Sequence, residues 1–447
     1  MPRRPVVLER LGAVLVAAAL AVPPLVPGTA RADQVRDAVT RVLESLDVPE
    51  AWTLARGAGV TVAVLDSGVD PHQADLAGSV TTGPDYTEGA SPAGVPPKRL
   101  HGTNMASIIA GHGHGPDGSL GVVGVAPRAR LLALRVILER DEPGFAAFTG
   151  NRRYAGTIAD GIRYAVDHGA DVINLSLGRS YPTERERAAV AYAIGRNVVV
   201  VAAAGNGGAD RTARRGGHTR YSYPASFPGV ISVAAVDAQG RHANFSNRNS
   251  AVVVSAPGVQ IIGAGPGDRY WIGDGTSPAT AFVSGVAALV RSRHPGLAPA
   301  LVAQAVVAST RHRPAGGYDL GVGFGRVDAL AALTASDALA GARTGGAGLP
   351  AGRRFAAGDV RPVQVVHRSG ALVVTCVALC ALCLAGLVAT GWRWRDEAWR
   401  IVACGRNLTS TPRRSWTRWT ASRRAASSRT GTSPRWWGGA GRGRSDG

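Results

Sequence analysis

Cysteine is nearly missing from this chain of 447 residues, and its few copies are poorly placed for cross-linking. The four lie near the C-terminal end, as Cys376, Cys380, Cys383 and Cys404. No disulfide can therefore staple the long part of the chain before them, which has to be stabilised by packing. With 45% hydrophobic residues the chain can bury a core large enough for that. Because Cys380 and Cys383 lie in an apolar run, their spacing is not interpreted as a redox motif.

Lysine is even rarer, since Lys98 is the only one among 50 basic residues. The net charge of +19 is unevenly spread: residues 1–32 carry +3 and residues 392–447 carry +10, which leaves +6 for the remainder. A protein that binds nucleic acid through its folded body would carry the excess on that body. The distribution therefore argues against a nucleic-acid partner.

Clustered metal ligands are also lacking. His112 and His114 lie close together, but the flexible glycines around them and the lack of a fourth ligand favour a surface loop over a metal site. No calcium site is recognisable in the sequence. We therefore expect neither a metal nor another cofactor.

The two ends of the chain carry targeting signals. Arg3 and Arg4 precede an apolar stretch at 11–26 that ends in Ala-Arg-Ala at 30–32, which is typical of a secretory signal peptide spanning residues 1–32. The alternative, an uncleaved anchor, is disfavoured by the prolines in this region. We expect a mature start at Asp33 and a short amphipathic extension at 33–50 that packs on the body.

A second apolar run at 370–391 has no charged residue and is long enough to span a bilayer. Arg393, Arg395 and Arg400 follow it, so the positive-inside rule places the body outside the cytoplasmic membrane and the basic tail, 392–447, inside. The tail has no periodicity and is predicted to be disordered. A Gly/Ala/Pro/Arg linker at 341–369 separates the span from the body.

The body, residues 51–340, alternates apolar strands with helices, which is typical of an α/β fold with a mainly parallel sheet. Ligands bind such sheets beyond the carboxyl ends of their strands. Strands are expected at 60–65, 131–136, 172–176, 198–203 and 230–236, and helices at 103–112, 155–168 and 184–196.

Four polar residues stand where chemistry is expected at this edge. Asp66 follows the first strand, His101 opens a helix, Asn206 follows the fourth strand, and Ser277 begins an apolar helix without a polar face. Each also has an ordinary interpretation: a turn carboxylate, a helix-terminal hydrogen-bonding group, a loop amide or a serine near a helix start.

Taken together, the motifs Asp-Ser-Gly, His-Gly-Thr, Ala-Ala-Gly-Asn and Gly-Thr-Ser, which begin at 66, 101, 203 and 275, resemble the subtilisin-like serine peptidases in type and order. The resemblance covers about 50–335 and implies that family's three-layer fold. It implies a triad of Asp66, His101 and Ser277, with the Asn206 amide and the Ser277 backbone N–H as oxyanion donors.

The resemblance also assigns a substrate cleft, although plain buried strands would show the same pattern. One wall contains Ser176, Leu177 and Gly178, and the other contains Gly121, with Ala203 and Gly205 completing the substrate-binding residues. Two positions depart from the family pattern, Pro278 directly after the serine and Ala281 in place of a proline.

The order of signal peptide, peptidase domain, linker and single span is similar to that of mycosins, the membrane-anchored proteases of type VII secretion. It implies an endopeptidase that cuts exported proteins, with peptide or protein substrates and a type VII secretion membrane complex as partners. Two alternatives stay open: a structural component that stabilises a secretion complex, with catalysis secondary, and a general degradative subtilase that is tethered to the membrane.

Overall fold

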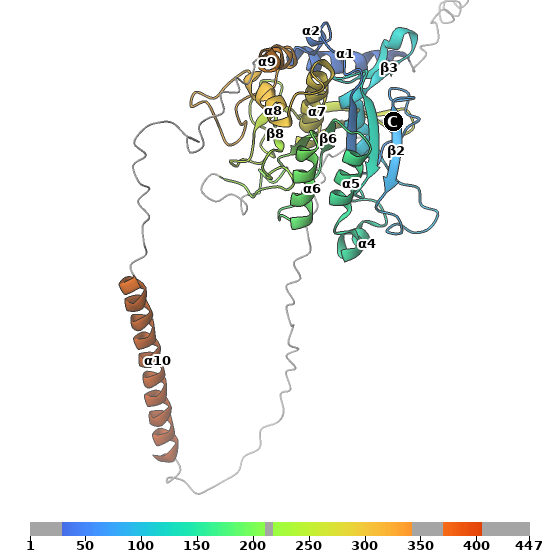
Figure 1. Cartoon of the computed structure of the whole chain (residues 1–447). Coiled ribbons are helices and arrows are strands. Elements are labelled where there is room, and N and C mark those ends of the chain that lie inside the picture. The colour runs from blue at the N-terminus through green and yellow to red at the C-terminus, as the bar shows by residue number, and fades with distance from the viewer. Residues whose placement is uncertain (1–28, 211–217, 342–369, 405–447) are drawn as a thin grey trace, which may run out of the picture. The chain divides into compact units, whose positions relative to one another are not determined.

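The computed structural model describes residues 29–210, 218–341 and 370–404 (Figure 1). Most of the predicted signal peptide, the linker from 342 onward and the tail from 405 onward lie outside these residues. The described chain comprises two units, the body and a separate helix, α10 (Gly370–Cys404), and each is described by itself.

A seven-stranded parallel sheet in the order β2-β5-β1-β6-β7-β8-β9 forms the centre of the body. Its strands are β1 (Thr61–Asp66), β2 (Val80–Asp85), β5 (Arg130–Arg135), β6 (Val172–Leu175), β7 (Val199–Ala203), β8 (Ile231–Val236) and β9 (Val254–Pro257). Two antiparallel hairpins accompany it, β3 (His112–His114) with β4 (Leu120–Val123), and β10 (Ile261–Gly265) with β11 (Arg269–Gly273). The inner strands β1, β7 and β8 are mostly apolar and buried along almost their whole length, as expected of a sheet that is covered on both faces.

Helices cover both faces of the sheet (Figure 1). The body helices are α1 (Thr29–Ser45), α2 (Val48–Ala51), α3 (Leu100–Ala110), α4 (Phe145–Gly150), α5 (Thr157–Asp167), α6 (Glu184–Gly195), α7 (Thr276–Arg293), α8 (Pro299–Ala308) and α9 (Ala329–Gly341). Alternate side chains of β1 divide between the layers: Val62 and Val64 pack with α3 and α7, whereas Ala63 and Leu65 pack with α5 and α6. The α/β prediction is thus confirmed.

Helix α7 is buried along almost its whole length. Every residue from Thr276 to Arg291 is buried, as its lack of a polar face predicts. Pro278 lies in its first turn, where a missing N–H costs no helical hydrogen bond. The helix begins directly after Gly275, so Ser277 lies at its N-terminal end.

The five expected strands and three expected helices are present with shifts of one to three residues at their ends. Sequence patterning missed β2, because its residues Val-Thr-Thr-Gly-Pro-Asp are mostly polar and only partly buried at the sheet edge. It also missed β9, which has four residues and ends on Pro257, and both hairpins.

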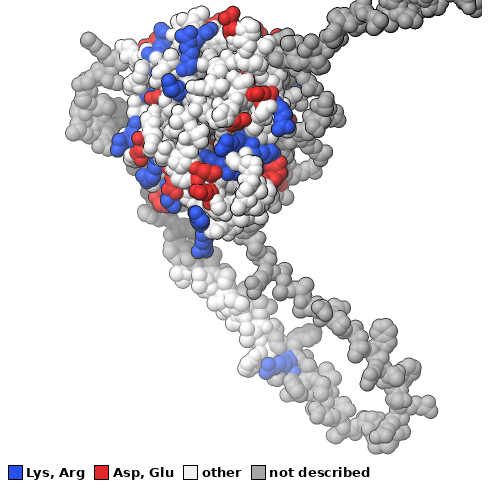
Figure 2. All heavy atoms as spheres, turned by 90° about the vertical axis from the view of Figure 1, so that its right-hand side faces the viewer, with Lys and Arg blue, Asp and Glu red and all other residues white. Residues whose placement is uncertain are grey.

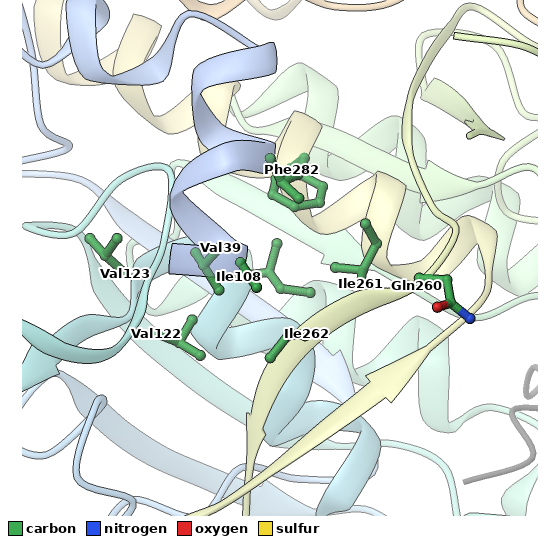
Figure 3. A pocket seen from close by; sticks show the side chains of 10 residues that line it. Val39, Ile108, Val122, Val123, Gln260, Ile261, Ile262 and Phe282 are labelled. Carbon is green, nitrogen blue, oxygen red and sulfur yellow. The ribbon is translucent and has the colours of Figure 1, made fainter. Parts of the chain in front are cut away.

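The N-terminal extension is part of the core, which confirms the prediction that it packs on the body. Leu43, Leu46, Val48 and Ala51 are at most 1% exposed. Figure 3 shows a small apolar pocket at this junction, where Val39 of α1 faces side chains from α3, β4, β10 and α7. Helix α1 begins at Thr29, before the predicted mature start at Asp33, and cleavage at that point stays a prediction.

Helix α10 covers the apolar run at 370–391 and continues to Cys404, so residues 392–404 are helical although the sequence predicted a disordered tail. None of the described helices is long and apolar enough to cross a bilayer. On the face displayed in Figure 2, basic and acidic side chains of the described residues are interspersed and do not form one basic patch.

Candidate functional site

The carboxylate of Asp66 lies at the carboxyl end of β1 and is fully buried. Its Oδ1 accepts a hydrogen bond from the backbone N–H of Ser67 at 2.7 Å and lies 2.7 Å from Nδ1 of His101. Because a carboxylate only accepts hydrogen bonds, Nδ1 must carry the proton, which leaves Nε2 of the neutral ring free to accept one. The first two residues predicted for the site are therefore in contact.

The imidazole of His101 is positioned by the first turn of α3. Burial by itself would lower the pKa of His101, but the negative charge of Asp66, its hydrogen bond, and the charge of Glu139 together raise that pKa above its ordinary value. The ring is still partly accessible, with 26% of the side chain exposed. It can thus exchange a proton with a bound molecule.

Ser277 is held at the same edge of the sheet by its contact with Ser176, the residue after the neighbouring strand β6. The register that pairs Val64 with Asn174 brings the residue after β6, Ser176, level with Asp66, and neighbouring strands lie about 4.8 Å apart. Two hydrogen bonds of 3.0 Å join Ser176 and Ser277, each hydroxyl donating to the other's carbonyl oxygen. The Ser277 hydroxyl therefore points to Ser176 here, and a bond to His101 would require it to rotate.

Asn206 follows β7 and is tied to the start of α7. Its Oδ1 accepts hydrogen bonds of 2.8 Å from both the backbone N–H and the hydroxyl of Thr276. Because the amide oxygen is taken by Thr276, the NH₂ group is the part of the side chain that remains to donate elsewhere. The NH₂ donor of Asn206 is thus held next to Thr276, the residue directly before Ser277.

The predicted substrate-binding residues fall into two places. Ser176, Leu177 and Gly178 follow β6, and Ala203 and Gly205 lie at the end of its neighbour β7, since the register pairs Leu175 with Ala202. The side chain of Leu177, however, is 2% exposed and packs in the core, so only its backbone can face a substrate.

The contacts of Gly121 are with other parts of the body than these five residues. It lies in β4, which pairs with β3, and its carbonyl oxygen accepts a hydrogen bond of 2.9 Å from Arg36 of α1. A Cβ at this position would lie 2.6 Å from the His114 ring and from the Tyr270 hydroxyl. The N-terminal extension therefore contacts this strand through Arg36, and the cleft-wall role expected for Gly121 stays a prediction.

His112 and His114 belong to β3 and are engaged with neighbouring groups. Nδ1 of His114 lies 2.6 Å from the buried carboxylate of Asp75, and His112 contacts the carbonyl oxygens of Gly113 and Ala77. Among the described residues there is no group of three or more side chains arranged to hold a metal ion.

Two residues near the site were not predicted from the sequence. Glu139 accepts hydrogen bonds from Ser67 and from the backbone of His101, but it lies in a loop without a recognisable pattern. The hydroxyl of Ser222 is buried next to Gly178 and has no hydrogen-bond partner among the described residues. Neither residue carries a sequence signal, because a loop far along the chain brings each to the site.

Comparison with known proteins agrees with this geometry. The model of the Subtilase family, Peptidase_S8, matches residues 57–325. The chain belongs to the subtilase family. Thermitase of Thermoactinomyces vulgaris is 38% identical to this subtilase over 251 residues, which is 56% of this chain and 81% of thermitase. The prediction of a subtilisin-like serine endopeptidase is thus confirmed at the level of the family.

Solved structures of mycosins are similar to this subtilase. The crystal structure of MycP1 from Mycobacterium smegmatis matches 66% of this chain and 84% of that one, with 31% identity and a TM-score of 0.53. The MycP3 protease from the type VII (ESX-3) secretion system matches 67% of this chain and 89% of that one, with 34% identity and a TM-score of 0.54. The predicted likeness to mycosins is confirmed.

Proposed function

We propose that this subtilase hydrolyses peptide bonds of exported proteins through Asp66, His101 and Ser277. The contact of 2.7 Å between the buried Asp66 carboxylate and Nδ1 of His101 is the observation that carries the proposal, and Ser277 is hydrogen-bonded to Ser176 after the neighbouring strand. A carboxylate in this position holds the imidazole in the tautomer whose Nε2 can accept a proton from a hydroxyl.

The reaction proceeds in two halves. The Ser277 oxygen attacks the peptide carbonyl carbon while Nε2 of His101 accepts the hydroxyl proton, and the imidazolium then gives that proton to the leaving amine as the C–N bond breaks. Water repeats the sequence on the acyl-enzyme ester, which releases the acid and restores Ser277. Asp66 keeps its negative charge throughout and stabilises the imidazolium.

The negative oxygen of the tetrahedral intermediate needs hydrogen-bond donors. The amide NH₂ of Asn206 is suited to this role because Thr276 holds the amide oxygen. The backbone N–H of Ser277 is the second donor, and it belongs to the first turn of α7, where N–H groups have no helical partner. Losing one such donor costs about 2.7–4 kcal/mol of transition-state stabilisation in subtilisin, which is the source of that figure.

Substrate binds along the ends of β6 and β7, with Ser176, Gly178, Ala203 and Gly205 as its contacts. An extended peptide can pair there with exposed backbone groups. Neighbouring glycines leave room for such a peptide to approach the strand ends closely. This mode of binding suits unfolded or extended segments of protein substrates.

The proposed location is the outer side of the cytoplasmic membrane, with residues 370–391 as a single-pass anchor. The charge-free apolar run and the arginines that follow it support this part of the proposal. The likeness to mycosin structures, one of which is described as part of a type VII secretion system, supports a role beside such a complex.

Replacement of Ser277 by Ala in the full chain tests the proposal. Peptide hydrolysis by the purified protein should fall by several orders of magnitude, on the order of 10⁴-fold or more. Hydrolysis at the wild-type rate would refute the proposed mechanism. Secretion measured in cells carrying the same variant separates the roles: uncut substrates with persisting secretion show that cutting depends on Ser277 and that secretion does not.

A further inference from the structure

The loop after β5 brings a second carboxylate, that of Glu139, to the imidazole-bearing end of α3. Its Oε1 accepts hydrogen bonds of 2.8 Å from the backbone N–H of His101 and 2.8 Å from the hydroxyl of Ser67. The Ser67 hydroxyl in turn accepts the backbone N–H of Gly102 at 3.1 Å. Glu139 and Ser67 together therefore satisfy two of the N–H groups that the start of a helix leaves without a helical partner.

This arrangement replaces the usual cap of a helix. The residue before α3, Arg99, has a left-handed backbone with φ of 53° and offers no side-chain hydrogen bond to the helix. The capping groups come instead from the ends of β1 and β5. Since Ser67 directly follows Asp66, one network holds the backbone of His101 and the residue next to its carboxylate partner.

The charge of Glu139 also has an electrostatic effect. The N-terminal end of a helix carries partial positive charge, which disfavours a protonated imidazole placed in its first turn. A carboxylate that accepts the His101 N–H offsets this charge and adds to the negative charge of Asp66. Only 11% of the Glu139 side chain is exposed, so water screens it weakly.

We propose that Glu139 is a positioning residue for His101, which anchors the first turn of α3 and supplies a second negative charge that stabilises the imidazolium formed during peptide-bond hydrolysis. The inference rests on the proposed function of His101 as the general base. Nothing in the sequence pattern around Glu139 identifies it, because the residue acts across a gap of 38 positions.

Other charged groups lie near Glu139 and His101, and they determine how strongly the Glu139 charge stabilises the His101 imidazolium. Lys98 lies 3.3 Å from Glu139 and 2.5 Å from Asp141, so it partly neutralises both. The backbone N–H of Glu139 donates to Glu142, which pairs with Arg135. The charged groups around the network are Asp66, Lys98, Arg135, Asp141 and Glu142.

Glu139→Gln removes the charge and keeps nearly the same shape, and Asp141→Asn is its matched control. The Asp141 side chain is 67% exposed and pairs with Lys98, so the control removes the same charge near the site and leaves the capping groups Glu139 and Ser67 in place. In the full chain with Ser277→Ala, ¹³C-labelled histidine is titrated by NMR, and the His101 signal is assigned from the spectrum of His101→Gln. We expect Glu139→Gln to lower the pKa of His101 more than Asp141→Asn does.

The second readout is the pH profile of peptide hydrolysis by the active full chain. Glu139→Gln should move the acid limb of kcat/KM to lower pH and reduce kcat on the plateau roughly fivefold, the difference between a charged and a neutral hydrogen bond, with KM unchanged. Glu139→Asp, which keeps the charge on a shorter side chain, should retain the position of the acid limb. A structural role alone would not move the acid limb.

The two readouts separate this inference from the proposed function. An unchanged His101 titration in Glu139→Gln overturns the inference even if the wild type hydrolyses peptides. If Glu139→Gln lowers the pKa of His101 but the wild-type chain has no peptidase activity, the role of Glu139 is supported and the proposed function is refuted instead. If Glu139→Gln does not fold, Lys98→Gln at the surface replaces it: the less neutralised Glu139 should raise the pKa of His101, and no rise overturns the inference.

Discussion

A single methyl group at Gly102 should disable the site, because this residue is where α3 meets the loop after β1. A Cβ there would overlap the Gly68 carbonyl oxygen and lie 3.0 Å from its carbon and 3.2 Å from the Asp66 Cβ. The two segments would have to separate by roughly 1 Å to relieve the overlap. This separation acts directly on the contact of 2.7 Å between Asp66 and His101.

A displacement of that size at a catalytic contact costs about 10²-fold in rate. We therefore expect Gly102→Ala to lower kcat for peptide hydrolysis by about two orders of magnitude. Gly195→Ala is the matched control, since Gly195 ends helix α6 and a Cβ there meets nothing within 4 Å. Both variants are assayed on one peptide substrate, with folding checked by circular dichroism. Wild-type activity in a folded Gly102→Ala protein would show that Asp66 and His101 need not be held together.

Three further outcomes follow from the structure. Because the pKa of His101 is raised, kcat/KM should fall with a midpoint above pH 6.5 as the medium is acidified, and a midpoint at or below 6.5 contradicts the assignment. Arg36→Met, which removes charged hydrogen bonds to the carbonyl groups of Gly118, Leu120 and Gly121, should lower the free energy of unfolding, measured in urea, by about 1.5–3 kcal/mol, whereas Arg41→Met, at an exposed position of the same helix, should change it little. Gly178→Ala, whose Cβ would overlap a buried hydroxyl and lie 3.2 Å from a carbonyl oxygen, should raise KM for peptides; an unchanged KM would remove this wall from the proposed cleft.

The raised pKa of His101 also links stability to pH. Its folded-state pKa exceeds the unfolded value, so the imidazolium stabilises the fold fully below pH 6.5, and this contribution is lost as the pH rises through the folded-state pKa. The linkage has the opposite direction to activity, which needs the neutral ring. As the pH rises through this pKa, the protein loses the stabilisation from the imidazolium and gains the neutral imidazole that acts as the base.

The parallel sheet and the residues at its edge could be predicted from the sequence because each depends on a local pattern. Apolar runs marked the inner strands, and two of them led to a polar residue: Asp66 ends β1, and Asn206 lies three residues after β7. The helix of Ser277 was recognisable because it has no polar face. These signals need no knowledge of distant contacts.

Features that depend on distant contacts could not be predicted. β2 is polar because it lies at an edge, so it lacks the apolar run of a central strand. Gly121 lies in a run that looks like an extended wall, but Arg36 of the N-terminal helix occupies its carbonyl group. Glu139 caps α3 by accepting the N–H of His101, 38 positions away from it, where no capping pattern applies.

Covalent labelling of the serine tests the proposal that Asp66, His101 and Ser277 act as one hydrolytic centre. A fluorophosphonate probe reacts with a serine only when a neighbouring base activates it. Mass spectrometry of the labelled full chain should locate the adduct on Ser277, and both Ser277→Ala and His101→Gln should abolish labelling. A folded wild-type chain that takes up no probe, or equal labelling of the His101→Gln protein, would show that these three residues do not form such a centre.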